Sequence, residues 1–140
     1  MNGMHRVYLD TQIYIYVLEK NPIFWDKAKD IIKEVEKRGD LVIASTLILA
    51  ELLSKPYEIG DLQSVEKTKL AFLNTTNLVV RDTDLEIAET AGYLRGKYGL
   101  RTPDAIHLAT AMELGCDRFI TNDKHFSRAT NKKIDIEFLE

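Results

Sequence analysis

Short apolar runs rich in β-branched and aromatic residues recur along the chain and alternate with longer amphipathic stretches. Each run is bounded by polar or turn-forming residues, which is typical of buried strands. Four runs predict strands and a fifth predicts an edge strand: residues 6–9, 41–44, 78–80, 118–120 and 134–138. Because strands separated by helices pair in parallel, we expect an α/β protein, a three-layer α/β/α sandwich with a parallel sheet of four to five strands.

Apolar residues at helical spacing fill the intervals between these strands. They predict helices over residues 11–18, 21 to about 37, 46–53, 62–73, 83–98 and 102–112. Asn21-Pro22 and Thr102-Pro103 each place a capping side chain before a proline at the first helical position. Thr83-Asp84-Leu85-Glu86 has capping-box spacing. The proline and glycine of Lys55–Asp61 predict a loop there.

The 140 residues are 45% hydrophobic and 29% charged, which suits one folded domain over residues 1–140. The single cysteine, Cys116, excludes an intrachain disulfide and a thiolate zinc site, and we expect it to be a half-buried packing residue. Met1–Arg6 lacks the features of a signal peptide, and no apolar run approaches the ~20 residues that span a bilayer. We therefore expect a cytoplasmic protein.

Four acidic residues stand where the chain leaves a predicted strand or begins the following helix: Asp10, Glu51, Asp104 and Asp123. In parallel α/β sheets these positions meet at the carboxyl edge, where function collects. Crowded carboxylates repel unless cations compensate them, and Mg²⁺ and Mn²⁺ prefer oxygen ligands. A held ion can activate water and stabilise charge on a phosphate. The net charge of −3 argues only weakly against nucleic acid, because two divalent ions would add about +4.

Each acid also has a structural explanation. Asp10 can cap the first helix, and Asp123 can cap the segment that contains His125; for both, the two explanations are balanced. Asp104 alone is explained best by the helix dipole. Glu51 can face solvent, although the leucines around it make that less natural. Their joint placement is what favours a metal site.

At this point four segments resemble PIN domains, and most closely the VapC-type toxins of prokaryotic toxin–antitoxin pairs. They are Val7–Thr11, Ser45–Leu52, Thr102–Ala111 and Phe119–Asp123, in the family's order over essentially the whole chain. The resemblance implies a five-stranded parallel sheet and Mg²⁺- or Mn²⁺-dependent endonucleolytic cleavage of RNA. It also implies inhibition by a cognate antitoxin protein and, commonly, a homodimer.

The same resemblance assigns roles to individual residues. Its metal-binding and catalytic acids are Asp10, Glu51, Asp104 and Asp123, with the last contributing to a second, weaker metal site. Thr121 matches a hydroxyl residue that supports a metal-bound water or a phosphate, and Thr11 matches the small hydroxyl residue after the first acid. Gln12 departs from the pattern, which has Asn or Ser there, and we expect its longer amide to affect the surroundings of Asp10 and hence metal affinity.

Several further side chains have two interpretations. His107 shares a helix face with Asp104 and can contact a substrate phosphate, but a packing or hydrogen-bonding role is favoured. Four basic residues can contact an RNA backbone or be ordinary solvated charges: Lys97, Arg101, Lys124 and Arg128. Four aromatic residues can form a partner interface, although burial in the core is the default: Tyr14, Tyr16, Phe24 and Trp25.

Two other functions compete with the ribonuclease. One is a PIN-fold module that binds RNA or protein without cutting, which the presence of all four acids disfavours. The other is a haloacid-dehalogenase-type phosphatase, because Asp10 ends a first strand. That chemistry has a second acid two residues later, and Gln12 stands there instead.

Overall fold

The computed structural model describes residues 5–129 and 133–140. Its sheet has five parallel strands in the order β3-β2-β1-β4-β5. The strands are β1 (Arg6–Leu9), β2 (Leu41–Ser45), β3 (Leu78–Arg81), β4 (Arg118–Thr121) and β5 (Asp135–Phe138). The helices are α1 (Thr11–Leu18), α2 (Trp25–Arg38), α3 (Thr46–Glu58), α4 (Leu62–Leu73), α5 (Leu85–Tyr98), α6 (Thr102–Glu113) and a 3₁₀ turn η1 (Lys124–Arg128).

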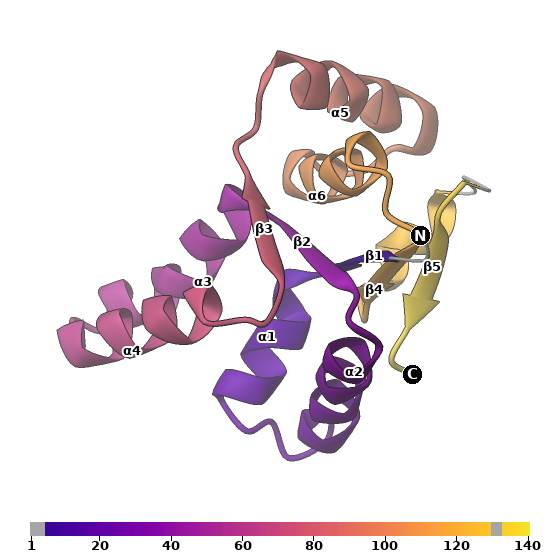
Figure 1. The fold of residues 1–140 in the computed structure, drawn as a ribbon. Helices are drawn as coiled ribbons and strands as arrows, with labels where there is room; N and C mark the ends of the chain where they lie inside the picture. The colour runs from indigo at the N-terminus through magenta and orange to yellow at the C-terminus, as the bar shows by residue number, and fades with distance from the viewer. Residues whose placement is uncertain (1–4, 130–132) are drawn as a thin grey trace.

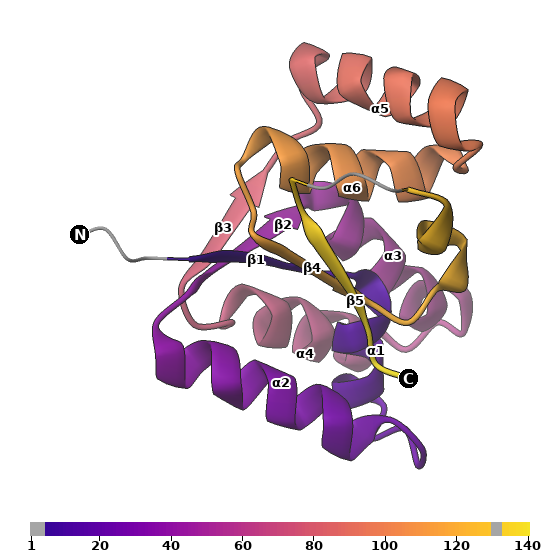
Figure 2. The same ribbon diagram turned by 90° about the vertical axis from the view of Figure 1, so that its right-hand side faces the viewer.

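Helices cover both faces of the sheet. Figures 1 and 2 show α5 and α6 on one face and α1 and α2 on the other, while α3 and α4 pack side by side and project to one side. The predicted three-layer α/β/α sandwich with a parallel sheet is therefore confirmed, including β5 at the edge. Among the described residues, no helix is long and apolar enough to cross a membrane.

Strand β1 lies at the centre of the sheet, and its burial explains its composition. Val7, Tyr8 and Leu9 are fully buried, and the ring of Tyr8 stacks on that of Phe119 from β4. From β1 the chain adds β2 and β3 on one side, and it then crosses back to add β4 and β5 on the other side of β1. The crevice outside the carboxyl ends of two such strands is the usual ligand site of open α/β sheets.

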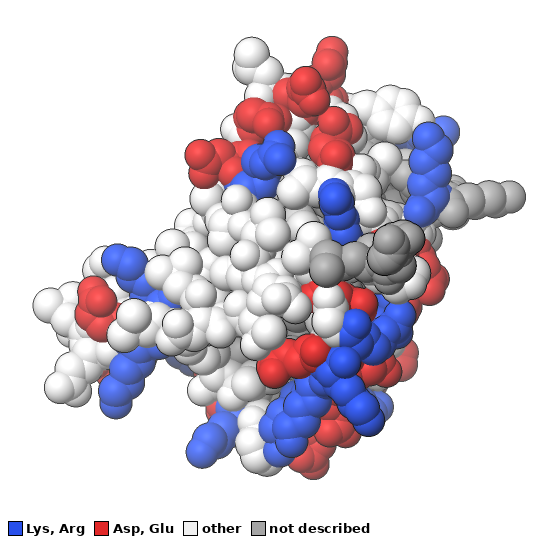
Figure 3. Space-filling model, in the orientation of Figure 1, with Lys and Arg blue, Asp and Glu red and all other residues white. Residues whose placement is uncertain are grey.

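Strand β3 is different because it lies at the opposite edge of the sheet from β5. Its Val79 and Val80 are 37% and 39% exposed. In Figure 3 uncharged side chains cover the middle of the face that carries β3, between charged groups above and below. An apolar edge strand of this kind is open to further pairing or packing.

The predicted loop over Lys55–Asp61 is wrong. Helix α3 continues to Glu58 with Pro56 inside its last turn, and only residues 59–61 connect it to α4. A proline so near the end removes one backbone hydrogen bond, and later bonds such as Ile59 N–H to Lys55 O still form. Gly60, with φ of 73°, then turns the chain.

Three helix starts differ from the predicted caps. Helix α2 begins at Trp25, because the side-chain oxygen Oδ1 of Asn21 accepts hydrogen bonds from Ile23 N–H and Phe24 N–H in a turn before the helix. Helix α5 is capped by Asp84, whose carboxylate accepts from Ile87 N–H, and not by Thr83. Helix α6 includes Thr102 and is preceded by Arg101. Caps depend on which side chain reaches a free N–H, and neighbouring polar residues compete for that position.

Cys116 and the four aromatic residues differ in how deeply they are buried. Cys116 is buried, not half-buried, and burial raises the pKa of its thiol to about 12, so it remains a protonated packing group. Of the four aromatic residues, Tyr14 is buried in the core against Phe72, and Tyr16 stacks on Phe24 at the core's margin. Trp25 is partly buried with Lys29 over its ring.

Candidate active site

Asp10 lies at the carboxyl end of β1 and is 6% exposed. Its backbone N–H donates to Ile120 O of β4, which fixes it at the sheet edge. One carboxylate oxygen accepts from Thr11 N–H at 2.9 Å, and the other accepts from Thr121 Oγ1 at 2.7 Å. Asp10 therefore caps α1 and also lies at the candidate site. Burial raises the pKa of this carboxyl, and the hydrogen bonds from Thr121 and from Thr11 N–H oppose the rise without cancelling it.

Glu51 projects from the second turn of α3 and is half-buried. Its Oε1 accepts from Thr11 Oγ1 at 2.6 Å and lies 2.7 Å from His107 Nε2. Burial alone would raise the pKa of Glu51, but the hydrogen bonds from His107 and Thr11 outweigh it and lower the pKa. Glu51 is thus held as an ionised carboxylate and is not a freely solvated side chain.

A buried chain of hydrogen bonds supports Glu51 from behind. Tyr8 OH lies 2.6 Å from His107 Nδ1, and Ser45 N–H donates to Tyr8 OH at 3.3 Å. The tyrosine oxygen accepts from Ser45 N–H, and Nδ1 of His107 is the acceptor within reach of its own proton. With the tyrosine proton on that side, His107 donates from Nε2 to the Glu51 carboxylate, which corresponds to the Nε2–H tautomer of His107.

His107 is 2% exposed and its ring nitrogens lie within hydrogen-bond distance of Tyr8 and Glu51, which agrees with the favoured interpretation as a packing or hydrogen-bonding residue. Its hydrogen-bond partner Tyr8 was not recognised from the sequence as part of the site. Tyr8 and His107 are 99 residues apart. The only local signal at Tyr8 is a polar hydroxyl within an otherwise apolar strand, because a buried tyrosine hydroxyl needs a partner.

Asp104 and Asp123 form the other part of the site. Asp104 lies in the first turn of α6, and Asp123 follows β4 and caps η1. Arg101 bridges them, with Nε 2.9 Å from Asp104 Oδ2 and Nη2 3.0 Å from Asp123 Oδ2. The other oxygen of Asp123 accepts from His125 N–H and lies 2.7 Å from His125 Nδ1. Burial opposes the charge of Asp123, but these His125 contacts and Arg101 lower its pKa.

Thr121 joins the two parts. Its hydroxyl donates to Asp10 and accepts from Asp123 N–H at 3.0 Å. The four predicted acids are therefore brought to one edge and connected through three polar residues: Thr11, Thr121 and Arg101. Thr121 is fully buried and donates its hydroxyl proton to Asp10, so in this structure its contact is with that carboxylate.

Gln12 is directed away from the role expected for it. Its Oε1 accepts from Asn122 N–H at 3.2 Å, and the Asn122 amide donates to Tyr16 OH at 3.1 Å. The longer amide thus ties α1 to the end of β4. The hydrogen bonds of the Asp10 carboxylate come from Thr11 and Thr121, so Gln12 does not contact it directly in this way.

An open concavity of about 600 Å³ adjoins Asp123, which is one of its lining residues. Its lining comes from the start of α1, the residue before α6, and the segment from the end of β4 into η1: Gln12, Arg101, Asn122, Asp123, Lys124, His125 and Arg128. Three of the four basic residues considered for RNA contact therefore line one surface. Lys97 does not, because its ammonium lies over Tyr93 and Tyr98 on α5.

These residues carry the oxygen ligands that suit a divalent metal ion, but their present arrangement does not form a complete set of ligands. Carboxylate oxygens at a strand end are ligands that Mg²⁺ and Mn²⁺ prefer, and the buried Asp10 would gain from a nearby cation. Within residues 5–129 and 133–140, however, no three His, Cys, Asp or Glu side chains are grouped closely enough to hold an ion. The Arg101 guanidinium compensates Asp104 and Asp123 instead.

A PIN domain profile matches residues 7–132, which is most of the chain. The chain belongs to the PIN domain family. Membership agrees with the parallel sheet and excludes the dehalogenase-type phosphatase. A search of curated proteins gave no match.

Solved structures share the PIN fold. VapBC2 from Rickettsia felis, bound to a DNA fragment from its promoter, aligns with a TM-score of 0.76 at 20% identity, covering 95% of this chain and 98% of that one. DNA-bound VapBC from Salmonella typhimurium gives 0.70 at 21% identity, covering 98% and 100%. VapC20 of Mycobacterium tuberculosis, a toxin that cleaves the sarcin-ricin loop, gives 0.69 at 16% identity, covering 92% and 98%. At these identities the likeness establishes the fold.

Proposed function

We propose that this PIN-family protein is a Mg²⁺- or Mn²⁺-dependent endoribonuclease that cleaves RNA with metal-activated water. The observation that carries the proposal is the linked set of four carboxylates at the carboxyl edge of the sheet, with an open concavity at Asp123 that Arg101, Lys124 and Arg128 also line. PIN-family membership supports the same chemistry.

In this proposal Asp10 and Asp104 are the main metal ligands, with Glu51 and Asp123 completing the site. The bound ion would lower the pKa of a water and stabilise charge on the phosphate. The protein's own contribution is orientation: Thr11 N–H and Thr121 fix Asp10, while Thr11 Oγ1 and His107 fix Glu51. Such support keeps carboxylates in place before the ion arrives.

RNA is the proposed substrate because of the shape and charge of the concavity. It is open to solvent, which suits a polymer better than a small enclosed ligand. Arg101, Lys124 and Arg128 line it, and basic side chains supply the sequence-independent affinity for a phosphate backbone. A structural neighbour of similar length is a toxin that cleaves the sarcin-ricin loop.

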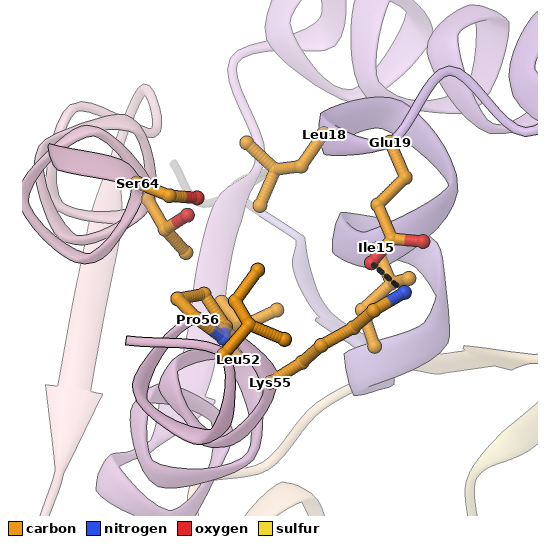
Figure 4. A pocket seen from close by; sticks show the side chains of 9 residues that line it. Ile15, Leu18, Glu19, Leu52, Lys55, Pro56 and Ser64 are labelled. Carbon is orange, nitrogen blue, oxygen red and sulfur yellow. Dashed lines mark ion pairs between the residues drawn. The ribbon is translucent and has the colours of Figure 1, made fainter. Parts of the chain in front are cut away.

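We further propose that the protein is a toxin controlled by an antitoxin. The neighbours include toxin–antitoxin complexes. A cavity of about 340 Å³ lies between α1 and the α3–α4 pair; Leu18 and Leu52 are among its lining residues, and the Lys55–Glu19 ion pair bounds it on one side (Figure 4). An amphipathic antitoxin segment suits such a site. Pull-down with the small protein from the neighbouring reading frame, by the native chain and by Leu18→Asp, tests this, because Leu18 lines the cavity and is 38% exposed.

A homodimer is also proposed, with the uncharged face over β3 as its interface (Figure 3). A second copy would cover the exposed valines of the edge strand. Light scattering of the purified protein measures the mass directly. A Val80→Lys variant that stays folded and becomes monomeric would support this face, and an unchanged mass would exclude it.

The central test is cleavage of a labelled RNA with Mg²⁺ or Mn²⁺ by the native chain and by Asp10→Asn. Equal cleavage by the two proteins would refute the mechanism. A second candidate, a PIN-fold module that binds RNA or protein without cutting, is favoured by the lack of a ready metal group among the described residues. Calorimetric titration with Mn²⁺ distinguishes them, because a non-cleaving module would give no binding heat.

A further inference from the structure

We propose that Arg101 is a built-in competitor of the divalent ion: its guanidinium holds Asp104 and Asp123 in the metal-free protein and must leave them when the ion binds. The inference rests on the metal site proposed above. Arg101 therefore weakens metal binding, whereas a residue that only held the carboxylates in place would strengthen it.

The geometry of the bridge carries the proposal. Arg101 uses two different nitrogens for two carboxylates that come from separate elements, at 2.9 Å to Asp104 and 3.0 Å to Asp123. The planar guanidinium suits such a two-armed contact, which a single ammonium cannot make. One oxygen of each acid is therefore hydrogen-bonded to Arg101. A cation that enters between these oxygens meets a group that is also positively charged.

The other two acids also lie within the influence of this guanidinium. Asp10 and Glu51 each interact electrostatically with Arg101, in addition to its direct partners. One arginine thus offsets part of the mutual repulsion of all four carboxylates. This explains how the acids remain together while no group of three among the described residues is arranged to hold an ion.

Arg101 is also placed so that it can be displaced. Its side chain is 64% exposed, whereas those of Asp104 and Asp123 are 11% and 14% exposed. Rotation of the side chain away from the acids breaks its hydrogen bonds to Asp104 and Asp123 and leaves the backbone bonds of α6 in place. An ion pair with an exposed partner contributes little free energy, whereas a divalent ion that binds several carboxylates gains much more.

The test is calorimetric titration of the full chain with Mn²⁺ for the native protein and for Arg101→Gln, Arg101→Lys and Arg81→Gln. Arg81 is the matched control, because it also pairs with a nearby aspartate, Asp84, but on β3 and away from the site. From the usual strength of exposed ion pairs, Arg101→Gln should bind Mn²⁺ about two- to thirtyfold more tightly. Arg101→Lys should fall between it and the native protein, and Arg81→Gln should match the native protein.

Four outcomes of this titration would overturn the competitor, the metal site or both. Unchanged or weaker Mn²⁺ binding by Arg101→Gln, with native binding intact, would overturn the competitor and leave the metal site standing. Equal tightening in Arg81→Gln would also overturn it, since net charge alone would then explain the gain. No binding by any variant, Arg101→Gln included, would refute the proposed metal site itself. Binding that Asp10→Asn does not abolish would locate the ion elsewhere and refute both.

A second measurement does not depend on affinity. The Nε–H of Arg101 is hydrogen-bonded to Asp104, so its NMR signal should be protected from solvent exchange in the metal-free protein. Saturation with the diamagnetic Mg²⁺ should remove that protection. A signal that stays protected at saturation would mean that the guanidinium and the ion occupy the acids together, and the proposal would fail.

Discussion

The candidate site has two parts that satisfy their carboxylates by different means. Asp10 and Glu51 accept hydrogen bonds from neutral groups in the core, namely Thr11, Thr121 and His107. Asp104 and Asp123 are instead joined by the charged Arg101, which lies largely in solvent. The first part is held by the fold itself, and the second by a side chain that can leave.

This difference has a consequence for how the site responds to its surroundings. Neutral donors fixed by strands and helices keep their geometry whether or not a cation is present, which is the preorganisation that ion binding needs. A displaceable counter-charge such as Arg101 lowers the repulsion between the carboxylates when no ion is bound. It also competes with the ion for those carboxylates. We therefore expect changes in the first part to affect catalysis and folding strongly, and changes in the second to adjust affinity.

The largest expected effect comes from the same substitution made in both parts. Asp10→Asn should reduce RNA cleavage more than about a hundredfold, and Asp123→Asn by about tenfold. Measurement of single-turnover cleavage at saturating Mn²⁺ compares them. Equal losses would mean that the two parts contribute alike.

The same pair should shift stability in opposite directions without metal. Because burial raises the pKa of Asp10, its charge destabilises the fold as pH rises above the unfolded-state value, and Asp10→Asn should melt higher at pH 7. Although burial opposes it, the pKa of Asp123 is lowered by His125 and Arg101, so its charge is stabilising and Asp123→Asn should melt lower. Both differences should shrink as pH falls and the carboxyls protonate. Melting in chelator across pH 4–7 checks the signs.

A somewhat smaller effect is expected at His107. His107→Ala leaves the buried Tyr8 hydroxyl and Glu51 without their partner, so stability should fall by about 1–3 kcal/mol and metal affinity by about 10- to 100-fold. His107→Gln restores a donor to Glu51 and should recover part of the metal affinity. His107 of the native protein should show the neutral Nε2–H pattern in ¹⁵N NMR. Loss of stability without any loss of affinity would make the histidine a packing residue only.

Thr121 tests the connection between the two parts. Thr121→Val keeps the shape and removes the hydroxyl that bonds both Asp10 and Asp123 N–H, so cleavage should fall by about tenfold. Thr110→Val is a suitable control, because that buried hydroxyl on α6 bonds only its own helix. If the two variants are equally active, the bridge has no functional role.

The smallest effect is expected at the rim of the concavity. Lys124→Ala combined with Arg128→Ala should weaken RNA binding by a few fold and reduce its salt dependence, by about 0.7 per lost phosphate contact in a log–log plot. Mn²⁺ affinity should not change. Lys67→Ala on α4 serves as the distant control, and an equal effect there would mean that only net charge matters.

Local pattern was enough to establish much of this protein. Alternating apolar runs and helical spacing predicted five strands, and the placement of Asp10, Glu51, Asp104 and Asp123 at strand exits predicted that they meet at one edge. These features depend on periodicity and on the geometry common to parallel sheets, both of which are visible over a few residues. Resemblance to a family then supplied the chemistry expected there.

What only the tertiary structure decided are contacts between distant segments. The link from Tyr8 to His107 spans 99 residues, and the bridge from Arg101 to Asp123 spans 22. The helical Pro56, which reads locally as a loop, lies in a helix packed against α4. Periodicity reports which face of an element is buried, but not which side chain it meets there. Packing made that choice, and with it determined which carboxylates are held rigidly and which are held by a charge that can move.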